Sequence, residues 1–150
     1  MIIMNIAFFM RPKQDVTFVY NDFTVRQALE KMHQTKYTAI PVLDHDGKYV
    51  GTISEGDLLW FIVKGEGGEP HTMAIENLED FIIIDMFPLA TKNPPCLITS
   101  SIDDLIIRAM ETNFVPIVDD RDMFIGIVTR RAIIKHFYDK HIFPENSTDR

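Results

Sequence analysis

The sequence predicts a mixed α/β (α+β) protein built from two pseudo-symmetric β-α-β-β-α repeats that pack as one tandem module. The chain has 150 residues, of which 46% are apolar and 25% charged, as is typical of a folded protein of about one domain. Its second half repeats the pattern of its first, and the spacing from Pro41 to Pro116 equals that from Gly51 to Gly126. Two copies favour a paired module over a solenoid, which needs at least about three repeats.

The first helix of each copy is marked by a capping signal and an apolar stripe. Thr24 followed by Gln27 is a capping box, in which each side chain bonds to the backbone N–H of the other residue. The apolar residues that follow recur with helical spacing: Val25, Ala28, Leu29 and Met32. Ser101 with Asp104 repeats this start in the second copy, so a second helix is expected there.

Two strands follow each of these helices. The first is a short apolar run that contains a proline, Ala39–Leu43 in copy one and Val115–Val118 in copy two. An Asp-containing turn then leads into a second apolar strand, which ends at Ser54 or at Thr129. Both residues are good N-caps, so another helix is expected to begin after each of them.

The chain is expected to divide according to these repeats. A Gly-rich stretch, Lys64–Pro70, predicts a flexible connector, and a helix is expected from Ile75 to Phe81. The predicted plan is repeat 1 with its N-terminal lead-in (1–63), a connector (64–81), repeat 2 (82–140) and a polar tail (141–150).

The composition argues against several classes of function. The net charge of −7 disfavours general binding to nucleic acid, because phosphate backbones are held by excess Lys and Arg. Cys96 is the only cysteine, which leaves no disulfide framework or multi-cysteine metal site, and the five histidines lack zinc-helix spacing. No nucleophile–base pair is visible. We therefore expect neither a metal site nor an enzyme.

The sequence also bears on location. The apolar run Met1–Met10 has no basic leader and no small-residue cleavage pattern, so it does not predict a signal peptide. A membrane span needs about 20 apolar residues, and the next run, Leu58–Val63, is far shorter. We expect a cytoplasmic protein without a membrane contact.

One further pattern occurs in both copies: an apolar strand with proline, an Asp turn, and a Gly-x-x-Ser/Thr strand end that leads into a helix. In copy one this end reads Gly51-x-x-Ser54-x-x-Asp57. The paired pattern resembles the tandem CBS-domain (Bateman) pair, over roughly Met10 to Phe137. The resemblance implies two clefts between the copies that bind adenine nucleotides, and a homodimer packed helix to helix.

A narrower resemblance concerns the ligand. Tyr37-Thr38-Ala39-Ile40-Pro41 together with Thr129-Arg130-Arg131 is similar to the small stand-alone bacterial CBS proteins that bind cyclic di-AMP. Arg130 and Arg131 follow the cap Thr129 directly, which suits either an anion clamp or two solvated surface charges. Tyr37 suits either stacking on a base or a half-buried place in the core. The resemblance implies that one cleft is formed by Val16, Thr17, Tyr37, Thr38, Ala39, Thr129, Arg130 and Arg131.

The other cleft is expected to differ. In the family the Ser/Thr of the motif faces a phosphate and the Asp holds ribose hydroxyls, a pattern that Ser54 and Asp57 fit. Copy two has Ala132 in place of that Asp, which suits a ligand held by phosphates and stacked bases. Glu55 and Asp57 repel phosphate, so the two clefts are not equivalent. The residues implied for this weaker second cleft are Cys96, Leu97, Phe114, Val115, Ser54 and Asp57.

These observations predict a non-enzymatic regulatory module that binds an adenine nucleotide and signals to a regulated protein that the sequence does not name. Cyclic di-AMP is the first candidate ligand, and AMP, ADP or ATP, as in an energy-state sensor, the alternative; no cofactor is expected. Two rival classes are an enzyme and a ligand-free dimeric interaction scaffold.

Overall fold

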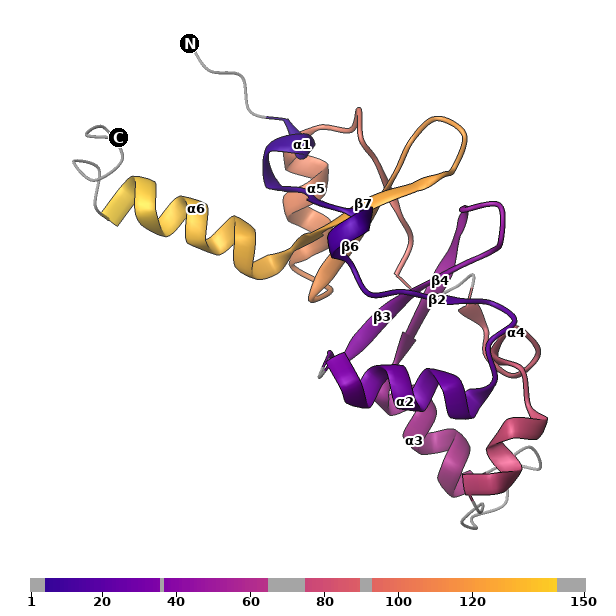
Figure 1. Cartoon of the computed structure of the whole chain (residues 1–150). Helices are drawn as coiled ribbons and strands as arrows, with labels where there is room; N and C mark the ends of the chain where they lie inside the picture. Colours follow the sequence, from indigo (N-terminus) through magenta and orange to yellow (C-terminus); the bar gives the residue numbers. More distant parts are fainter. Residues whose placement is uncertain (1–4, 36, 65–74, 90–92, 143–150) are drawn as a thin grey trace. The chain divides into compact units, whose positions relative to one another are not determined.

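The computed structural model of the chain describes residues 5–35, 37–64, 75–89 and 93–142. The chain divides into two compact units (Figure 1). The repeat-1 unit comprises Thr17–Pro94, and the repeat-2 unit comprises Met1–Val16 together with Pro95–Arg150. Most of the predicted flexible connector and the end of the predicted polar tail lie outside the described residues.

The repeat-1 unit has a three-stranded sheet in the order β2-β3-β4. Its elements are β2 (Val19–Tyr20), α2 (Val25–Thr35), β3 (Ala39–Leu43), β4 (Tyr49–Ser54) and α3 (Glu55–Lys64). Strand β2 pairs parallel with β3, and β3 pairs antiparallel with β4. A 3-10 helix, η2 (Ile75–Asp80), and a short helix, α4 (Ile83–Met86), complete the unit. The helix expected from Ile75 is thus present, with 3-10 geometry.

The repeat-2 unit has a four-stranded sheet in the order β1-β7-β6-β5. Its repeat consists of β5 (Cys96–Leu97), α5 (Ile102–Ala109), β6 (Phe114–Val118), β7 (Phe124–Thr129) and α6 (Arg130–Ile142). The N-terminal segment adds α1 (Ile6–Phe9), β1 (Arg11–Pro12) and the 3-10 helix η1 (Lys13–Asp15). The predicted order of strand, helix, strand, strand, helix is therefore confirmed in both copies.

The local capping signals form as the sequence predicts. The Thr24 N–H donates to Oε1 of Gln27 at 2.9 Å, and the Gln27 N–H donates to Oγ1 of Thr24 at 3.1 Å. In copy two the Asp104 N–H donates to Oγ of Ser101 at 3.1 Å. The apolar stripe of α2 then buries Val25, Ala28 and Met32 in the core of the repeat-1 unit.

Each lead-in packs with the other copy of the repeat. Strand β1 pairs antiparallel with β7, so the residues before Val16 belong to the repeat-2 unit in space. The corresponding lead-in of repeat 2 packs on repeat 1, where the Ile83 N–H donates to the Phe23 carbonyl at 2.9 Å. Gly51 has a φ of +153° and lies against the Leu89 backbone, leaving no room for a side chain. The repeats therefore exchange their lead-ins.

Within the described ranges, none of the helices combines the length and the apolar character that crossing a membrane requires.

Candidate functional site

The start of α6 is the centre of the predicted anion site, and it lies in the repeat-2 unit. Thr129 ends β7, and its Oγ1 accepts a hydrogen bond from the Ala132 N–H at 3.1 Å, so Thr129 caps the helix. The N-terminal end of such a helix carries a partial positive charge and N–H groups that suit a phosphate. Arg131 is exposed in the first turn of α6 and can reach an anion there.

Arg130 has a different role from Arg131. Its Nε donates to the Ala109 carbonyl at 2.8 Å and its Nη2 to the Met110 carbonyl at 3.2 Å. These carbonyls belong to the C-terminal end of α5, where a cation is stabilising because that end of the helix is partly negative. Arg130 is therefore a capping residue of α5. Neither of the two sequence interpretations, solvated charge or anion clamp, anticipated this contact.

The other residues of the predicted first cleft lie at strand ends. Tyr37 is 37% exposed, Thr38 is exposed, and Ala39 is half-buried at the start of β3. The Thr38 carbonyl accepts a hydrogen bond from the Glu55 N–H at 2.9 Å, which fixes this strand start against α3. These residues and the half-buried Thr17 belong to the repeat-1 unit, whereas the buried Val16 belongs to the repeat-2 unit with Thr129. That the two groups form one cleft stays a prediction.

Ser54 and Asp57 form a complete capping box at the start of α3. The Asp57 N–H donates to Oγ of Ser54 at 3.1 Å, and the Ser54 N–H donates to Oδ2 of Asp57 at 2.9 Å. At the start of α6, Thr129 makes only the first of these two bonds, because Ala132 has no side-chain acceptor. The carboxylate of Asp57, to which the resemblance assigns the ribose hydroxyls, thus closes the first turn of its own helix.

The remaining residues of the predicted second cleft are mostly core residues of the repeat-2 unit. Cys96, Phe114 and Val115 are buried, so their side chains pack inside the unit. Leu97 is 44% exposed on β5. A ligand at this strand edge would therefore meet backbone groups and the Leu97 side chain. Cys96 is a free cysteine whose thiol is buried in this core.

The two helix starts carry opposite charges. Glu55 and Asp57 lie in the first turn of α3, whereas α6 begins with Arg130 and Arg131. Acidic groups satisfy the helix dipole but repel a phosphate, whereas a guanidinium attracts it. The repeat-2 helix start is thus the better anion site of the two.

Two polar groupings were not found from the sequence. Burial raises the pKa of Tyr49, whose hydroxyl donates to the Asn93 carbonyl at 2.7 Å and lies 2.7 Å from Oγ1 of Thr52. On the exposed surface of the same unit, the His45 ring stacks on Tyr20 with centroids 4.3 Å apart. Both groupings join residues that are distant in sequence, so spacing gives no signal for them.

No metal centre is formed by the side chains that the structure describes, because nowhere do three or more His, Cys, Asp or Glu residues come together in a suitable group.

Comparison with protein families identifies the family of this chain. The CBS domain matches twice, at residues 6–64 and 85–139, which correspond to the two repeats. The chain belongs to the CBS domain family, as the resemblance implied.

Individual relatives support the same fold. The chloroplastic CBS domain-containing protein CBSX1 of Arabidopsis thaliana is 28% identical over 144 residues, which are 85% of this chain and 61% of that protein. A structure of CbpB in complex with c-di-AMP aligns with a TM-score of 0.80 at 22% identity, covering 95% of this chain and 91% of that one. Listeria monocytogenes CbpB in complex with c-di-AMP aligns with a TM-score of 0.72 at 28% identity, covering 87% and 92%.

The chain is shorter than the curated relatives that it matches first: it spans 61% of the length of one and 46% of the next.

Proposed function

We propose that the protein is a non-enzymatic regulatory module that binds an adenine nucleotide, with cyclic di-AMP as the first candidate. The observation that carries this proposal is the start of α6, where Thr129 caps the helix and the exposed Arg131 lies in its first turn. CbpB of Listeria monocytogenes, a relative at 28% identity, is described in complex with c-di-AMP.

Each proposed contact uses a group whose chemistry fits the ligand. The α6 N–H groups and the Arg131 guanidinium bind phosphate oxygens, and Arg130 adds positive charge from its capping position on α5. The ring of Tyr37 stacks on an adenine base, and the small Ala39 leaves room beside the strand. Val16, Thr17 and Thr38 complete the cleft. Binding alters the surface presented to a regulated protein, which requires that the nucleotide prefer one of two states.

AMP, ADP or ATP is the second candidate, and a specific observation favours it. Asp57 places a carboxylate at the start of α3, where the family motif holds ribose hydroxyls. A linear nucleotide presents such a 2′,3′-diol, whereas the ribose 3′ oxygens of cyclic di-AMP are esterified. The second cleft, with Leu97 at its edge, is thus the proposed place for a mononucleotide.

Isothermal titration calorimetry with purified protein tests the proposal. Cyclic di-AMP, AMP, ADP, ATP and S-adenosylmethionine are titrated in turn, and cyclic di-AMP is expected to give the strongest binding. Arg131→Ala should weaken it by about tenfold or more, the effect of losing a charge-assisted hydrogen bond of roughly 1.5–3 kcal/mol. The control is Lys140→Ala, which removes an equal charge from the exposed far end of α6.

Two results would count against the proposal. The absence of binding heat from every nucleotide would favour the ligand-free scaffold. An Arg131→Ala affinity within about twofold of wild type would show that Arg131 does not contact the phosphate.

We further propose that the module is a cytoplasmic homodimer that packs helix to helix. Several apolar side chains on the helices are exposed in the single chain, among them Leu59, Trp60 and Ile134 at 61%, 60% and 59%. Clusters of exposed apolar side chains on one face are typical of protein–protein interfaces.

A further inference from the structure

Arg130 joins the start of α6 to the end of α5 through both its backbone and its side chain. Its backbone N–H donates to the Asn113 carbonyl at 2.9 Å, in the turn that follows α5. One edge of its guanidinium, formed by Nε and Nη2, donates to the carbonyls of Ala109 and Met110. Among the residues that the structure describes, none accepts a hydrogen bond from Nη1. The half-buried side chain therefore keeps donors for a further acceptor.

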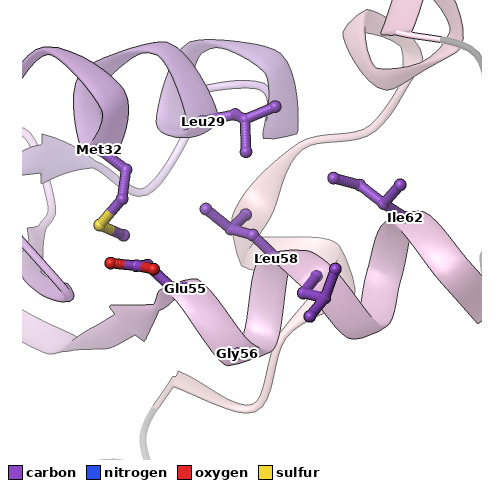
Figure 2. Close-up of a pocket in the computed structure, with 7 residues that line it drawn as sticks. Leu29, Met32, Glu55, Gly56, Leu58 and Ile62 are labelled. Carbon is purple, nitrogen blue, oxygen red and sulfur yellow. The ribbon is translucent and has the colours of Figure 1, made fainter. Parts of the chain in front are cut away.

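The first copy of the repeat lacks the side-chain part of this link. Glu55 corresponds to Arg130, since each is the first residue of the second helix of its copy. Its backbone N–H makes the equivalent bond, to the Thr38 carbonyl at 2.9 Å. Figure 2 shows its side chain beside Met32 of α2, but an ionised carboxylate has no proton to donate to the carbonyls of a helix end. The side-chain link is thus particular to the repeat-2 unit.

We infer that Arg130 couples the phosphate proposed at the start of α6 to the last turn of α5, by binding both at once. This inference rests on the proposed function and adds how occupancy of that site is transmitted within the unit. A guanidinium donates along two edges at the same time, so Nη1 binds a phosphate oxygen while Nε and Nη2 stay on the α5 carbonyls.

The coupling arises because both contacts use one conformation of the same side chain. Fixing an arginine side chain loses much conformational entropy. In the free protein only the bonds to Ala109 and Met110 offset that loss. Once a phosphate holds the guanidinium, these bonds form with little further loss of entropy, so the nucleotide stabilises the end of α5. By thermodynamic reciprocity, a stable α5 end in turn strengthens nucleotide binding.

The last turn of α5 is where this effect reaches the surface of the unit. Met110 is 75% exposed. Its N–H donates to the Ile106 carbonyl at 3.1 Å, and the Glu111 N–H donates to the Arg108 carbonyl at 3.0 Å. Hydrogen bonds at a helix end open more readily than those of the core. Opening of these two bonds is therefore the local event that a bound nucleotide suppresses.

Amide hydrogen exchange of the full chain, resolved by NMR, tests the coupling. The Met110 and Glu111 amides are compared without ligand and with cyclic di-AMP at a saturating concentration, which calorimetry sets for each variant. In the wild type the nucleotide should slow their exchange by about fivefold or more, the usual size of a coupling between two sites. Arg130→Lys keeps the positive charge, but its compact ammonium group cannot hold both sites, so the change should be less than about twofold.

The matched control is Arg121→Lys, the same substitution in the exposed turn between β6 and β7, which should keep the wild-type response. Equal slowing in Arg130→Lys and wild type would mean that the nucleotide shields α5 directly, and would overturn the coupling but not the proposed function. Unchanged exchange in a saturated wild type would do the same.

Two further outcomes are also decisive. Arg130→Lys should still bind cyclic di-AMP, because Arg131 and the α6 N–H groups remain; complete loss of its binding would make Arg130 a ligand contact alone and overturn the coupling. The absence of binding heat from cyclic di-AMP in the wild type would overturn both the coupling and the binding of this nucleotide.

Discussion

Arg130 and Arg131 are adjacent in the chain but contact different surroundings. The Arg130 guanidinium bonds to the carbonyls of Ala109 and Met110, whereas Arg131 is exposed in the first turn of α6. One guanidinium therefore stabilises the fold, and the other is exposed at the helix start, where the proposed function requires it to meet a phosphate. This distinction depends on where the end of α5 lies in space, although α5 and Arg130 are separated by two strands in the chain.

Stability measurements should separate these two arginines. Arg130→Ala leaves the terminal carbonyls of α5 without their charged donor and should lower the free energy of unfolding by about 1–2 kcal/mol, allowing for partial exposure to solvent. Arg131→Ala should change it by less than about 0.5 kcal/mol. Urea unfolding followed by circular dichroism measures both. An equal loss in the two variants would contradict the assigned roles.

Tyr49 makes the stability of the protein depend on pH in the alkaline range. Burial raises the pKa of its hydroxyl in the folded state, so the unfolded chain ionises first as the pH rises past about 10. Wild-type stability should then fall above that pH by up to about 1.4 kcal/mol per pH unit from this residue alone. Tyr49→Phe removes the ionising group, so its unfolding free energy should fall less steeply as the pH rises above about 10. Parallel pH curves for the two proteins would refute this.

At the scale of elements, the starts of α3 and α6 differ in one bond. Ser54 and Asp57 cap each other reciprocally, whereas Thr129 has Ala132 as its partner and forms one bond only. Because Ala132 stands where copy one has Asp57, the start of α6 is slightly less stable and has no negative charge. The residue that weakens the cap therefore also removes a group that would repel an anion.

Ala132→Asp should strengthen the cap of α6 and make the start of this helix less favourable for an anion. A carboxylate at this position can complete the capping box and raise the free energy of unfolding by about 0.5–1 kcal/mol. The same negative charge should repel phosphate and lower the affinity for cyclic di-AMP by about tenfold. Ala132→Asn is the control, because its amide oxygen can cap without a charge and should retain most of the affinity. If both variants bound the nucleotide equally well, phosphate would not lie at this helix start.

The order of elements could be predicted from the sequence because its signals are local. Thr24 and Gln27 form their capping box within one turn of helix, and the strand Ala39–Leu43 is observed with its predicted bounds. The contact of Arg130 with α5 could not be predicted, because it depends on how two helices of the unit pack. The same holds for Tyr49, whose partner Asn93 lies far away in the sequence. For the candidate site, residue types and helix starts were accessible from the sequence, whereas the roles of individual side chains were not.

For the whole molecule, the exchanged lead-ins are the main organising feature. Ile6 is fully buried in the repeat-2 unit, and β1 pairs with β7 there, although Ile6 and β1 both lie near the N-terminus. Ile82, in the lead-in of repeat 2, forms an isolated β-bridge with Thr24 in the repeat-1 unit. Neither repeat is therefore complete with its own lead-in alone.

A substitution near the N-terminus should consequently destabilise the C-terminal repeat. Ile6→Ala should lower the free energy of unfolding by about 2–4 kcal/mol, because it leaves a cavity among buried side chains. Phe8→Ala is the control, since Phe8 is 58% exposed; it should cost less than about 1 kcal/mol. Amide hydrogen exchange should quicken in β7 and stay unchanged in β4. Faster exchange in β4 instead would place the N-terminal segment in the other unit.

The pairing of β1 with β7 also sets an order of events during synthesis on the ribosome. Arg11 pairs with Ile127, so its partner is made only when most of the chain has been synthesised. At about 5–20 residues per second, Ile6 and Phe9 are synthesised roughly 6–24 seconds before β7, against which they pack. The repeat-1 unit, which ends at Pro94, can assemble in that interval. Ile6 and Phe9 can therefore be buried in the repeat-2 unit only after β7 has been synthesised.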